Sequence, residues 1–163
     1  MRLFWEVSLA ILPDNAICIA DSKDANSVLV YIPPQSKDPS LLDYIKAGGM
    51  KMFFKFGIRR IIRLTHFNIK IEQVAKRYRT ANDGYLMAFA TQLDKQGQHY
   101  GKPLITALLN HLDTSSESCY LETMEEKNVA LYQHFSFQLE GQADSKKGNL
   151  ALYAMRRPGN PTL

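Results

Sequence analysis

The sequence predicts a mixed α/β fold: a mostly antiparallel sheet with a central βαβ unit and flanking helices. Three observations predict it. Strand-like runs separated by short turns at residues 15–34 and 137–157 indicate an antiparallel hairpin near each end. Between them, residues 85–124 read as strand, loop, helix and strand. This order predicts two parallel strands joined by a right-handed crossover. A length of 163 residues suits a single domain over residues 1–163.

The first part of the chain is expected to form a hairpin followed by helices. "NAICIADS" (15–22) and "NSVLVYIPP" (26–34) are strand-like, and the double proline ends the second run. Residues 40–79 have a mostly helical pattern of apolar residues, with a separate second helix at about 67–79. Three glycines divide this region: Gly48, Gly49 and Gly57.

The second part of the chain carries the βαβ unit and the final hairpin. "YLMAFATQL" (85–93) is a continuous apolar run, which is typical of a buried strand. The elements expected after it are a helix over 101–112, a strand over 118–124, a short helix over 126–135, and strands over 137–144 and 149–157 around the turn "SKKGN". The tail 159–163 is expected to be loose.

Charge and hydropathy restrict the classes of partner. A net charge of +4 and a pI of about 9.0 suit an anionic small molecule and do not require nucleic acid. No apolar run approaches the roughly 18 residues that a membrane span needs. Glu6 interrupts the apolar N-terminal stretch, which argues against a signal peptide.

The two cysteines indicate no special chemistry. Cys18 and Cys119 both lie inside apolar runs, so each is expected to be a small buried hydrophobic residue. Two cysteines without partnered histidines make no metal site, and no metal is expected. Because nothing indicates a disulfide framework, a reducing compartment, the cytoplasm, is the expected location.

The stretch "LDKQGQHYGKPLITALL" (93–109) joins the predicted strand to the predicted helix. The first turn of a helix has unsatisfied N–H groups and a positive dipole end, and glycine lets an anion approach the backbone closely. Gly97 and Gly101 therefore suggest a phosphate site. Two glycines alone are a weak signal, and a polar loop before an amphipathic helix is the alternative.

A second motif downstream strengthens the phosphate interpretation. "NVALYQHFSF" begins at Asn128, and it follows the strand "SCYLETM". Together the two motifs resemble those of the GNAT acyl-CoA N-acetyltransferases, whose pyrophosphate loop reads Gln/Arg-x-x-Gly-x-Gly/Ala. The closing "LYAMRRPG", "VLVYIPP" and "GIRRIIRL" more particularly resemble the puromycin N-acetyltransferase-like branch. The resemblance covers residues 16–159 and implies a GNAT fold.

The resemblance implies acetyl-CoA as cosubstrate and assigns residues to it. The strand edge over 88–93 would lie along the pantetheine, and a backbone N–H near Phe89, Ala90 or Thr91 would stabilise the oxyanion. The loop that would hold the pyrophosphate comprises Gln96, Gly97, Gln98, His99, Tyr100, Gly101 and Lys102. Asn128 would contact the cofactor, although it could instead stabilise the short helix as an N-cap-type residue.

The resemblance also assigns two catalytic side chains for transfer of an acetyl group to a primary amine of a small molecule, directly in a ternary complex. Tyr132 matches the tyrosine that protonates the leaving thiolate; the alternative is a half-buried helix tyrosine. Glu122 is the candidate base, directly or through water, and could instead be a polar strand end or a substrate contact. Thr123 and Tyr85 are cleft residues without a defined role.

Three departures from the family pattern bear on function. His99 stands where the family has the middle glycine, so its side chain is expected to point away from the phosphates or to add a charge-assisted contact. Ser136 replaces a glycine before Phe137. Only residues 1–14 precede the first predicted strand, where the family has a strand and two helices. The fold is therefore expected to be N-terminally shortened, with an open acceptor pocket or a partner chain that fills it.

Two further alternatives remain open at this point. The segment 51–63 interleaves cations with apolar residues; it could cover a core and shape the acceptor pocket, or contact lipid or nucleic acid. The expected partner is a small-molecule amine, and a second copy of the chain is a further candidate; no membrane and no nucleic acid are expected. The alternative function is a GNAT-fold module that binds CoA, or only a partner, without turnover.

Overall fold

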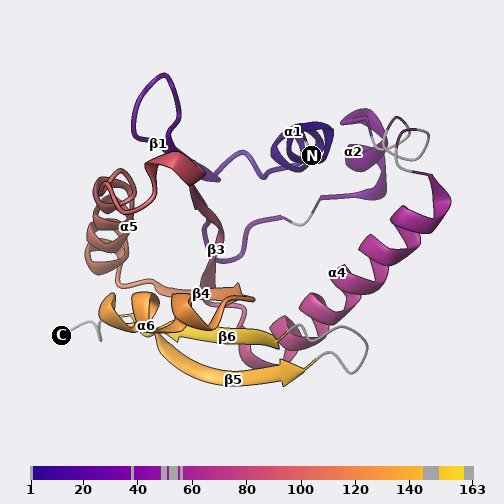
Figure 1. Cartoon of the computed structure of the whole chain (residues 1–163). Coiled ribbons are helices and arrows are strands. Elements are labelled where there is room, and N and C mark those ends of the chain that lie inside the picture. Colours follow the sequence, from indigo (N-terminus) through magenta and orange to yellow (C-terminus); the bar gives the residue numbers. More distant parts are fainter. Residues whose placement is uncertain are drawn as a thin grey trace.

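The structure is a computed structural model that describes residues 2–37, 39–48, 51, 55, 57–144 and 151–159. It contains a six-stranded open sheet in the order β1-β2-β3-β4-β6-β5, with α5 and α4 on opposite sides of β3 (Figure 1). β3 and β4 pair in parallel, and the other four neighbouring pairs are antiparallel. The mixed sheet with a central βαβ unit is therefore confirmed.

The bounds of the elements are close to those expected. The strands are β1 (Ile17–Ala20), β2 (Ser27–Ile32), β3 (Asp83–Thr91), β4 (Ser118–Thr123), β5 (Gln138–Asp144) and β6 (Ala151–Arg157). The helices are α1 (Arg2–Ala10), α2 (Leu41–Lys46), α4 (Ile58–Tyr78), α5 (Lys102–Ser115) and α6 (Glu126–His134), with a 3-10 turn, η1, at Leu93–Lys95. Both predicted hairpins are present, β1–β2 and β5–β6.

Two expectations about the helices were wrong. The separate helix at about 67–79 is the second half of α4, which is one continuous helix of 21 residues. Neither glycine nor proline occurs between Ile58 and Tyr78, so nothing in the sequence interrupts it. Residues 2–10, to which no element was assigned, form α1. The turn 145–149, the end of the tail and part of the basic segment 51–63 lie outside the described residues.

The side chains of the sheet alternate between two covered faces. Leu29, Tyr31 and Leu86 point to the face that α5 and α6 cover, which we call face A. Tyr120 and Ala154 pack on the opposite face, face B, where α4 lies. Full burial of one leucine contributes about 2 kcal/mol, so these two clusters hold the helices against the sheet.

A buried carboxylate fixes the start of the parallel pair. Asp83, at the beginning of β3, is 1% exposed. Its carboxylate accepts hydrogen bonds from the Thr80 amide at 2.7 Å, the Thr80 hydroxyl at 2.9 Å and the Ser118 hydroxyl at 2.5 Å. Because Ser118 begins β4, these bonds join the two strands at their amino ends and satisfy the buried charge.

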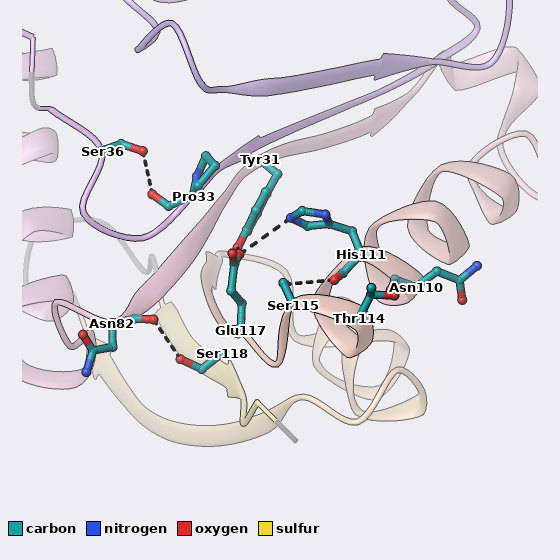
Figure 2. Close-up of polar contacts among 10 residues, drawn as sticks. All are labelled: Tyr31, Pro33, Ser36, Asn82, Asn110, His111, Thr114, Ser115, Glu117 and Ser118. Carbon is teal, nitrogen blue, oxygen red and sulfur yellow. Dashed lines mark hydrogen bonds and ion pairs between the residues drawn. The ribbon is translucent and has the colours of Figure 1, made fainter. Parts of the chain in front are cut away.

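A second polar cluster supports the same end of the sheet from face A (Figure 2). The buried Tyr31 hydroxyl donates to Glu117 Oε2 at 2.5 Å, and His111 Nε2 of α5 lies 3.7 Å from the same oxygen. The Tyr31 ring also meets His111 edge to face, at 5.8 Å between centroids. Gly84 has no room for a Cβ, because the Tyr31 hydroxyl occupies that space. The cluster therefore positions β2, β3 and α5 together.

Beyond this anchored end, β3 and β4 diverge. Their pairing ends at Tyr85 opposite Tyr120, although β3 continues to Thr91 and β4 to Thr123. A β-bulge interrupts the β2–β3 pairing, so that Met87 is the extra residue between Leu86 and Ala88. Bulges bend a strand and increase its twist. The carboxyl halves of two parallel strands are thus left apart in the middle of the sheet.

Helix α6 ends in a Schellman motif with serine at the position that favours glycine. The Phe137 amide donates to the Tyr132 carbonyl at 3.1 Å, and the Ser136 amide donates to the Gln133 carbonyl at 3.0 Å. Ser136 has a φ of 66°, in the left-handed region. Phe137 packs edge to face on Tyr132, with centroids 5.7 Å apart. The turn therefore holds the Tyr132 ring in place.

Replacing Ser136 with glycine should raise the free energy of unfolding by about 1 kcal/mol, because glycine adopts the left-handed conformation without the Cβ penalty. Chemical denaturation of the wild type and of the variant measures this. Ser136→Ala is the matched control and should not be stabilised, because it keeps the Cβ. Equal stability of the glycine and alanine variants would show that this φ is not strained.

Candidate active site

Two adjoining pockets lie at the end of β3, beyond the part of the strand that pairs with β4. The first, of about 460 Å³, is lined by Phe89, Ala90, Thr91, Gln96, Gly97, Glu125, Lys127, Asn128, Leu131 and Tyr132. The second, of about 430 Å³, is lined by Phe89, Thr91, Lys95, Gly97, His99, Tyr100, Gly101, Lys102, Ile105, Leu131, His134 and Phe135. Four residues belong to both pockets: Phe89, Thr91, Gly97 and Leu131. The end of β3, the following loop and α6 therefore form one continuous groove.

The loop over residues 96–102 lines this groove and has free backbone donors. The amides of Gly97, His99, Tyr100 and Gly101 donate to no acceptor within the described part of the chain. Gly101 caps the start of α5, where the positive end of the helix dipole lies. Unsatisfied amides at the start of a 14-residue helix favour an anion.

Backbone conformation explains two positions in this loop. Gly97 has a φ of 76°, and His99 has a φ of 65° although it carries a Cβ. His99 thus adopts the conformation that glycine would adopt without strain, at the position where the resembling motif has glycine. Histidine is among the residues that tolerate this region best. His99 is exposed and lines the second pocket.

At position 101, lack of space for a Cβ requires glycine, whereas backbone conformation does not. Its φ of −76° suits any residue, but a Cβ there would lie 2.8 Å from Phe89 Cζ and 3.5 Å from the Ser27 hydroxyl. The Phe89 ring lines both pockets. A side chain at Gly101 would therefore displace the ring that forms the floor of the groove.

Replacing Gly101 with alanine should lower the affinity for acetyl-CoA about tenfold, because overpacking of this kind costs about 1–3 kcal/mol and the Phe89 ring must move into the groove. Calorimetric titration measures the change in Kd. Gly97→Ala is the matched control: a Cβ there meets nothing within 4 Å, so the cost is backbone strain at its positive φ. The free energy of unfolding of the Gly97→Ala variant should fall by about 1 kcal/mol, without a comparable change in the shape of the pocket. Unchanged affinity in Gly101→Ala would contradict the assignment of the groove.

Most of the predicted cofactor residues come together in the groove. Ten of the eleven line one pocket or the other: Phe89, Ala90, Thr91, Gln96, Gly97, His99, Tyr100, Gly101, Lys102 and Asn128. Gln98 does not; its exposed side chain donates to the Asp94 carbonyl at 2.8 Å. It shapes the turn rather than the pocket.

Four titratable residues of the groove were not predicted. Lys95 and His134 line the second pocket, and Glu125 and Lys127 line the first. Lys127 lies next to Asn128 in the first turn of α6, so its place beside the second motif was a usable signal. Lys95 belongs to the turn η1, whose fold the sequence pattern does not specify. Lys95, Lys102 and Lys127 bring positive charge to the groove, where Lys95 also pairs with Asp94 at 3.9 Å and Lys127 with Glu125 at 3.8 Å.

Asn128 is not the N-cap residue of α6, which is Glu125. Its side-chain amide donates to the Thr123 hydroxyl at 3.2 Å, and that hydroxyl also accepts from the Glu125 amide at 3.4 Å. The Asn128 backbone amide donates to the Glu125 carbonyl at 2.9 Å. Asn128 therefore ties the start of α6 to the end of β4 while it lines the first pocket.

Tyr132 lies in the last turns of α6 and lines the first pocket. It is 8% exposed, and burial raises the pKa of its hydroxyl to about 12. The side chain is therefore protonated at neutral pH and can act as a proton donor. The contact with Phe137 fixes the plane of its ring.

Glu122 lies on β4 with Tyr120, on face B, and lines neither of the two pockets described above. Burial raises the pKa of its carboxyl group, whereas the hydroxyls of Tyr85 and Tyr120 and the charge of Arg79 act in the opposite direction. The Tyr85 and Tyr120 rings stack with centroids 6.3 Å apart, and the Arg79 guanidinium lies 5.0 Å from the Tyr85 centroid.

The carboxylate of Glu122 is not fully satisfied. Its Oε1 atom and the Tyr120 hydroxyl are buried, and neither forms a hydrogen bond of ordinary geometry within the described residues, although the Tyr85 and Tyr120 hydroxyls lie close enough to lower the pKa of the carboxyl group. A buried carboxylate oxygen without a well-formed hydrogen bond is costly. Tyr132 and Glu122 thus face opposite sides of the sheet at the point where the strands part.

Both cysteines were expected to be buried, and this expectation is wrong for Cys18 and confirmed for Cys119. Cys119 is fully buried in β4, but Cys18 is exposed. Cys18 lies on the edge strand β1, on the face opposite Ile17 and Ile19, which pack on the core of face A. An apolar run in an edge strand buries one face only, so the sequence alone could not distinguish the two cysteines.

Among the described residues, no group of three or more histidine, cysteine or acidic residues could hold a metal ion. None of the described helices combines the length and the hydropathy needed to cross a bilayer.

Comparison with solved structures identifies the fold. A histone acetyltransferase HPA2-related acetyltransferase from Corynebacterium glutamicum matches with a TM-score of 0.67 and 18% identity, over 99% of this chain and 76% of its own. A structure described as an acetyltransferase matches with a TM-score of 0.57 and 14% identity, over 98% of this chain and 79% of its own. A putative acetyltransferase from Agrobacterium tumefaciens matches with a TM-score of 0.50 and 9% identity, over 96% and 85%.

Family models, curated sequences and partial structural matches do not extend this identification of the fold. No protein-family model matches the chain, and no curated protein matches its sequence. The chain spans 58% of the ribosomal-protein-S18-alanine N-acetyltransferase of Escherichia coli, with a TM-score of 0.44, which is too low to bear on function. At identities of 18% and below, the whole-chain matches establish architecture alone. The chain has the fold of the GNAT acetyltransferases.

Proposed function

We propose that this protein transfers the acetyl group of acetyl-CoA to the primary amine of a small molecule, directly in a ternary complex. The observation that carries the proposal is the groove formed by the end of β3, the loop over 96–102 and α6, which is lined by residues with free backbone amides and by the buried Tyr132. Membership of the puromycin N-acetyltransferase-like branch stays a prediction.

Residues of the groove would bind different parts of acetyl-CoA. The amides of Gly97 and of residues 99–101 would bind the pyrophosphate, with Lys95, Lys102 and Lys127 supplying positive charge at the rim. The pantetheine would lie along the end of β3, where the strand has no partner on the β4 side. A backbone N–H between Phe89 and Thr91 would stabilise the oxyanion.

The transfer requires two proton movements. The amine nitrogen attacks the thioester carbonyl, a C–N bond forms, and the C–S bond breaks to release the thiolate of CoA. Glu122 would accept the proton that the amine loses, directly or through water, and its raised pKa suits this task near neutral pH. Tyr132 would donate its proton to the thiolate. The products are the N-acetylated amine and CoA.

A two-stage measurement tests the proposal. Thermal unfolding with acetyl-CoA and with CoA is expected to show stabilisation by both, because each binds only the folded state. Release of free thiol is then followed over a panel of primary amines, and at least one amine should support turnover. Stabilisation without thiol release would identify a binding module rather than an enzyme. Absence of stabilisation by either nucleotide would contradict both functions.

A further inference from the structure

A third pocket, of about 410 Å³, lies on face B and is apolar. Its lining residues are Leu9, Cys18, Ile19, Ala20, Val28, Leu29, Val30, Ala88 and Ala90. None of these side chains is charged. Ala90 also lines the first pocket of the candidate active site. The apolar pocket therefore meets the proposed acetyl-CoA groove at the unpaired end of β3.

The register of the strands explains why this pocket exists. Cys18 pairs with Val30, Val30 with Ala88, and Val28 with both Ala20 and Ala90, so small side chains cover face B across three strands. Leu9 of α1 forms one wall. Figure 1 shows α1 on the side of β3 opposite α5, so the helix that packs on face A does not fill this space. Because the residues of this floor are small, space for a pocket remains between the sheet and α1.

Glu122 lies on the same side of the sheet as this pocket. Tyr85 and Tyr120 are paired and both pack on face B, and Glu122 follows Tyr120 by two residues. Because strand side chains alternate with a period of two, Glu122 also points to face B. Ala88 follows Tyr85 on the same face after the bulge. The Glu122 carboxylate on β4 and the β3 edge of the apolar floor therefore lie on the two strands that flank the gap.

We propose that this apolar pocket binds the body of the acceptor, so that the substrate is a primary amine on an uncharged alkyl or arylalkyl group. The inference rests on the proposed function and adds the class of acceptor to it. The body of the amine would lie on Ala20, Val28 and Ala88, and its nitrogen would lie at the gap, between Glu122 and the thioester. Attack from face B and departure of the thiolate on face A follow from this placement.

The chemistry of the lining discriminates between acceptors. A volume of about 410 Å³ suits a small ligand, and burial of its methylene groups against the apolar lining favours binding. A second ammonium group on the body would have to leave water with no charged partner in the lining, which strongly disfavours binding. Hexylamine and 1,6-diaminohexane are therefore a matched pair of probes, with equal carbon chains and one added charge.

Cys18 makes binding measurable without turnover. It lines the pocket and is exposed, whereas Cys119 is fully buried and serves as the internal control. The full chain is treated with N-ethylmaleimide, alone and with desulfo-CoA, which has no thiol to react. Intact-mass spectrometry then follows labelling of Cys18. Hexylamine should slow this labelling at least fivefold, and 1,6-diaminohexane should change it less than twofold.

A variant that fills the pocket provides the second measurement. Ala20→Phe places a ring on the floor at the edge strand, away from the acetyl-CoA groove. The variant should have a KM for hexylamine about tenfold higher than the wild type. The thermal stabilisation by acetyl-CoA should stay unchanged, and this result would show that the variant is folded.

The possible outcomes separate this inference from the proposed function. Equal protection by both amines, or by neither, overturns the apolar acceptor, even if acetyl-CoA still stabilises the protein and another amine supports thiol release. Loss of labelling with rising protein concentration, without any amine, would show that a second copy covers the pocket and would also overturn it. No stabilisation by acetyl-CoA or CoA would instead contradict the proposed function.

Discussion

Replacing Tyr132 with phenylalanine is expected to lower kcat about 100-fold, because the variant keeps the ring and loses only the proton donor. Burial raises the pKa of this hydroxyl to about 12, so it holds its proton throughout the neutral range. The ring contact with Phe137 does not involve the hydroxyl, and the groove should keep its shape. The Kd for acetyl-CoA, measured by calorimetry, should therefore change by less than about twofold.

Tyr44→Phe is the matched control for this variant. Tyr44 is an exposed tyrosine of α2, remote in sequence from the groove and absent from its lining. It loses the same atom, and its kcat should equal that of the wild type. Full activity of Tyr132→Phe would show that another group protonates the thiolate, and the proposed role of Tyr132 would be wrong.

Replacing Glu122 with glutamine is expected to reduce kcat/KM about 100-fold, because glutamine cannot accept the proton of the amine. In the wild type, kcat/KM should rise with pH as Glu122 loses its proton. Because burial raises the pKa of Glu122, this rise should occur at a pH above the usual pKa of a glutamate. The variant should lack this rise. Glu72→Gln, on the exposed surface of α4, is the control and should keep the profile of the wild type.

The same variant has a predictable effect on stability. A carboxyl group whose pKa is raised by folding stabilises the protein below its unfolded pKa, and this contribution is lost as the pH rises through the folded pKa. Glu122→Gln should therefore gain stability relative to the wild type at pH 7, and the gain should shrink toward pH 4. A stability difference that is independent of pH would contradict a buried Glu122 with a raised pKa.

The two motifs predicted more of the site than either could alone. At His99 and Ser136, the two positions where the chain departs from glycine, the backbone has φ values of 65° and 66°. The conformation that glycine favours is thus retained although the residue has changed. The loop and the end of α6 therefore form at the predicted positions, whereas the role of the loop in binding CoA stays a prediction.

The sequence could not specify which face each side chain occupies. Glu122 and Tyr132 were predicted as one catalytic pair, but they lie on opposite faces of the sheet. The face of each residue on β3 depends on the bulge at Met87, which shifts the alternation by one residue and leaves no clear signal in "YLMAFATQL". The exposure of Cys18 and the apolar pocket depend on the same registers and could not be predicted either.

Hydrogen–deuterium exchange with and without CoA tests the central claim most directly, because it reports on individual segments of the backbone. The amides of Gly97, His99, Tyr100 and Gly101 donate to no acceptor among the described residues, so they should exchange fast in the free protein. CoA should slow exchange in the peptide that spans the loop over 96–102 and in the peptide that ends β3, and leave α4 unchanged. Protection confined to other segments, or no protection at saturating CoA, would contradict the assignment of this groove as the acetyl-CoA site.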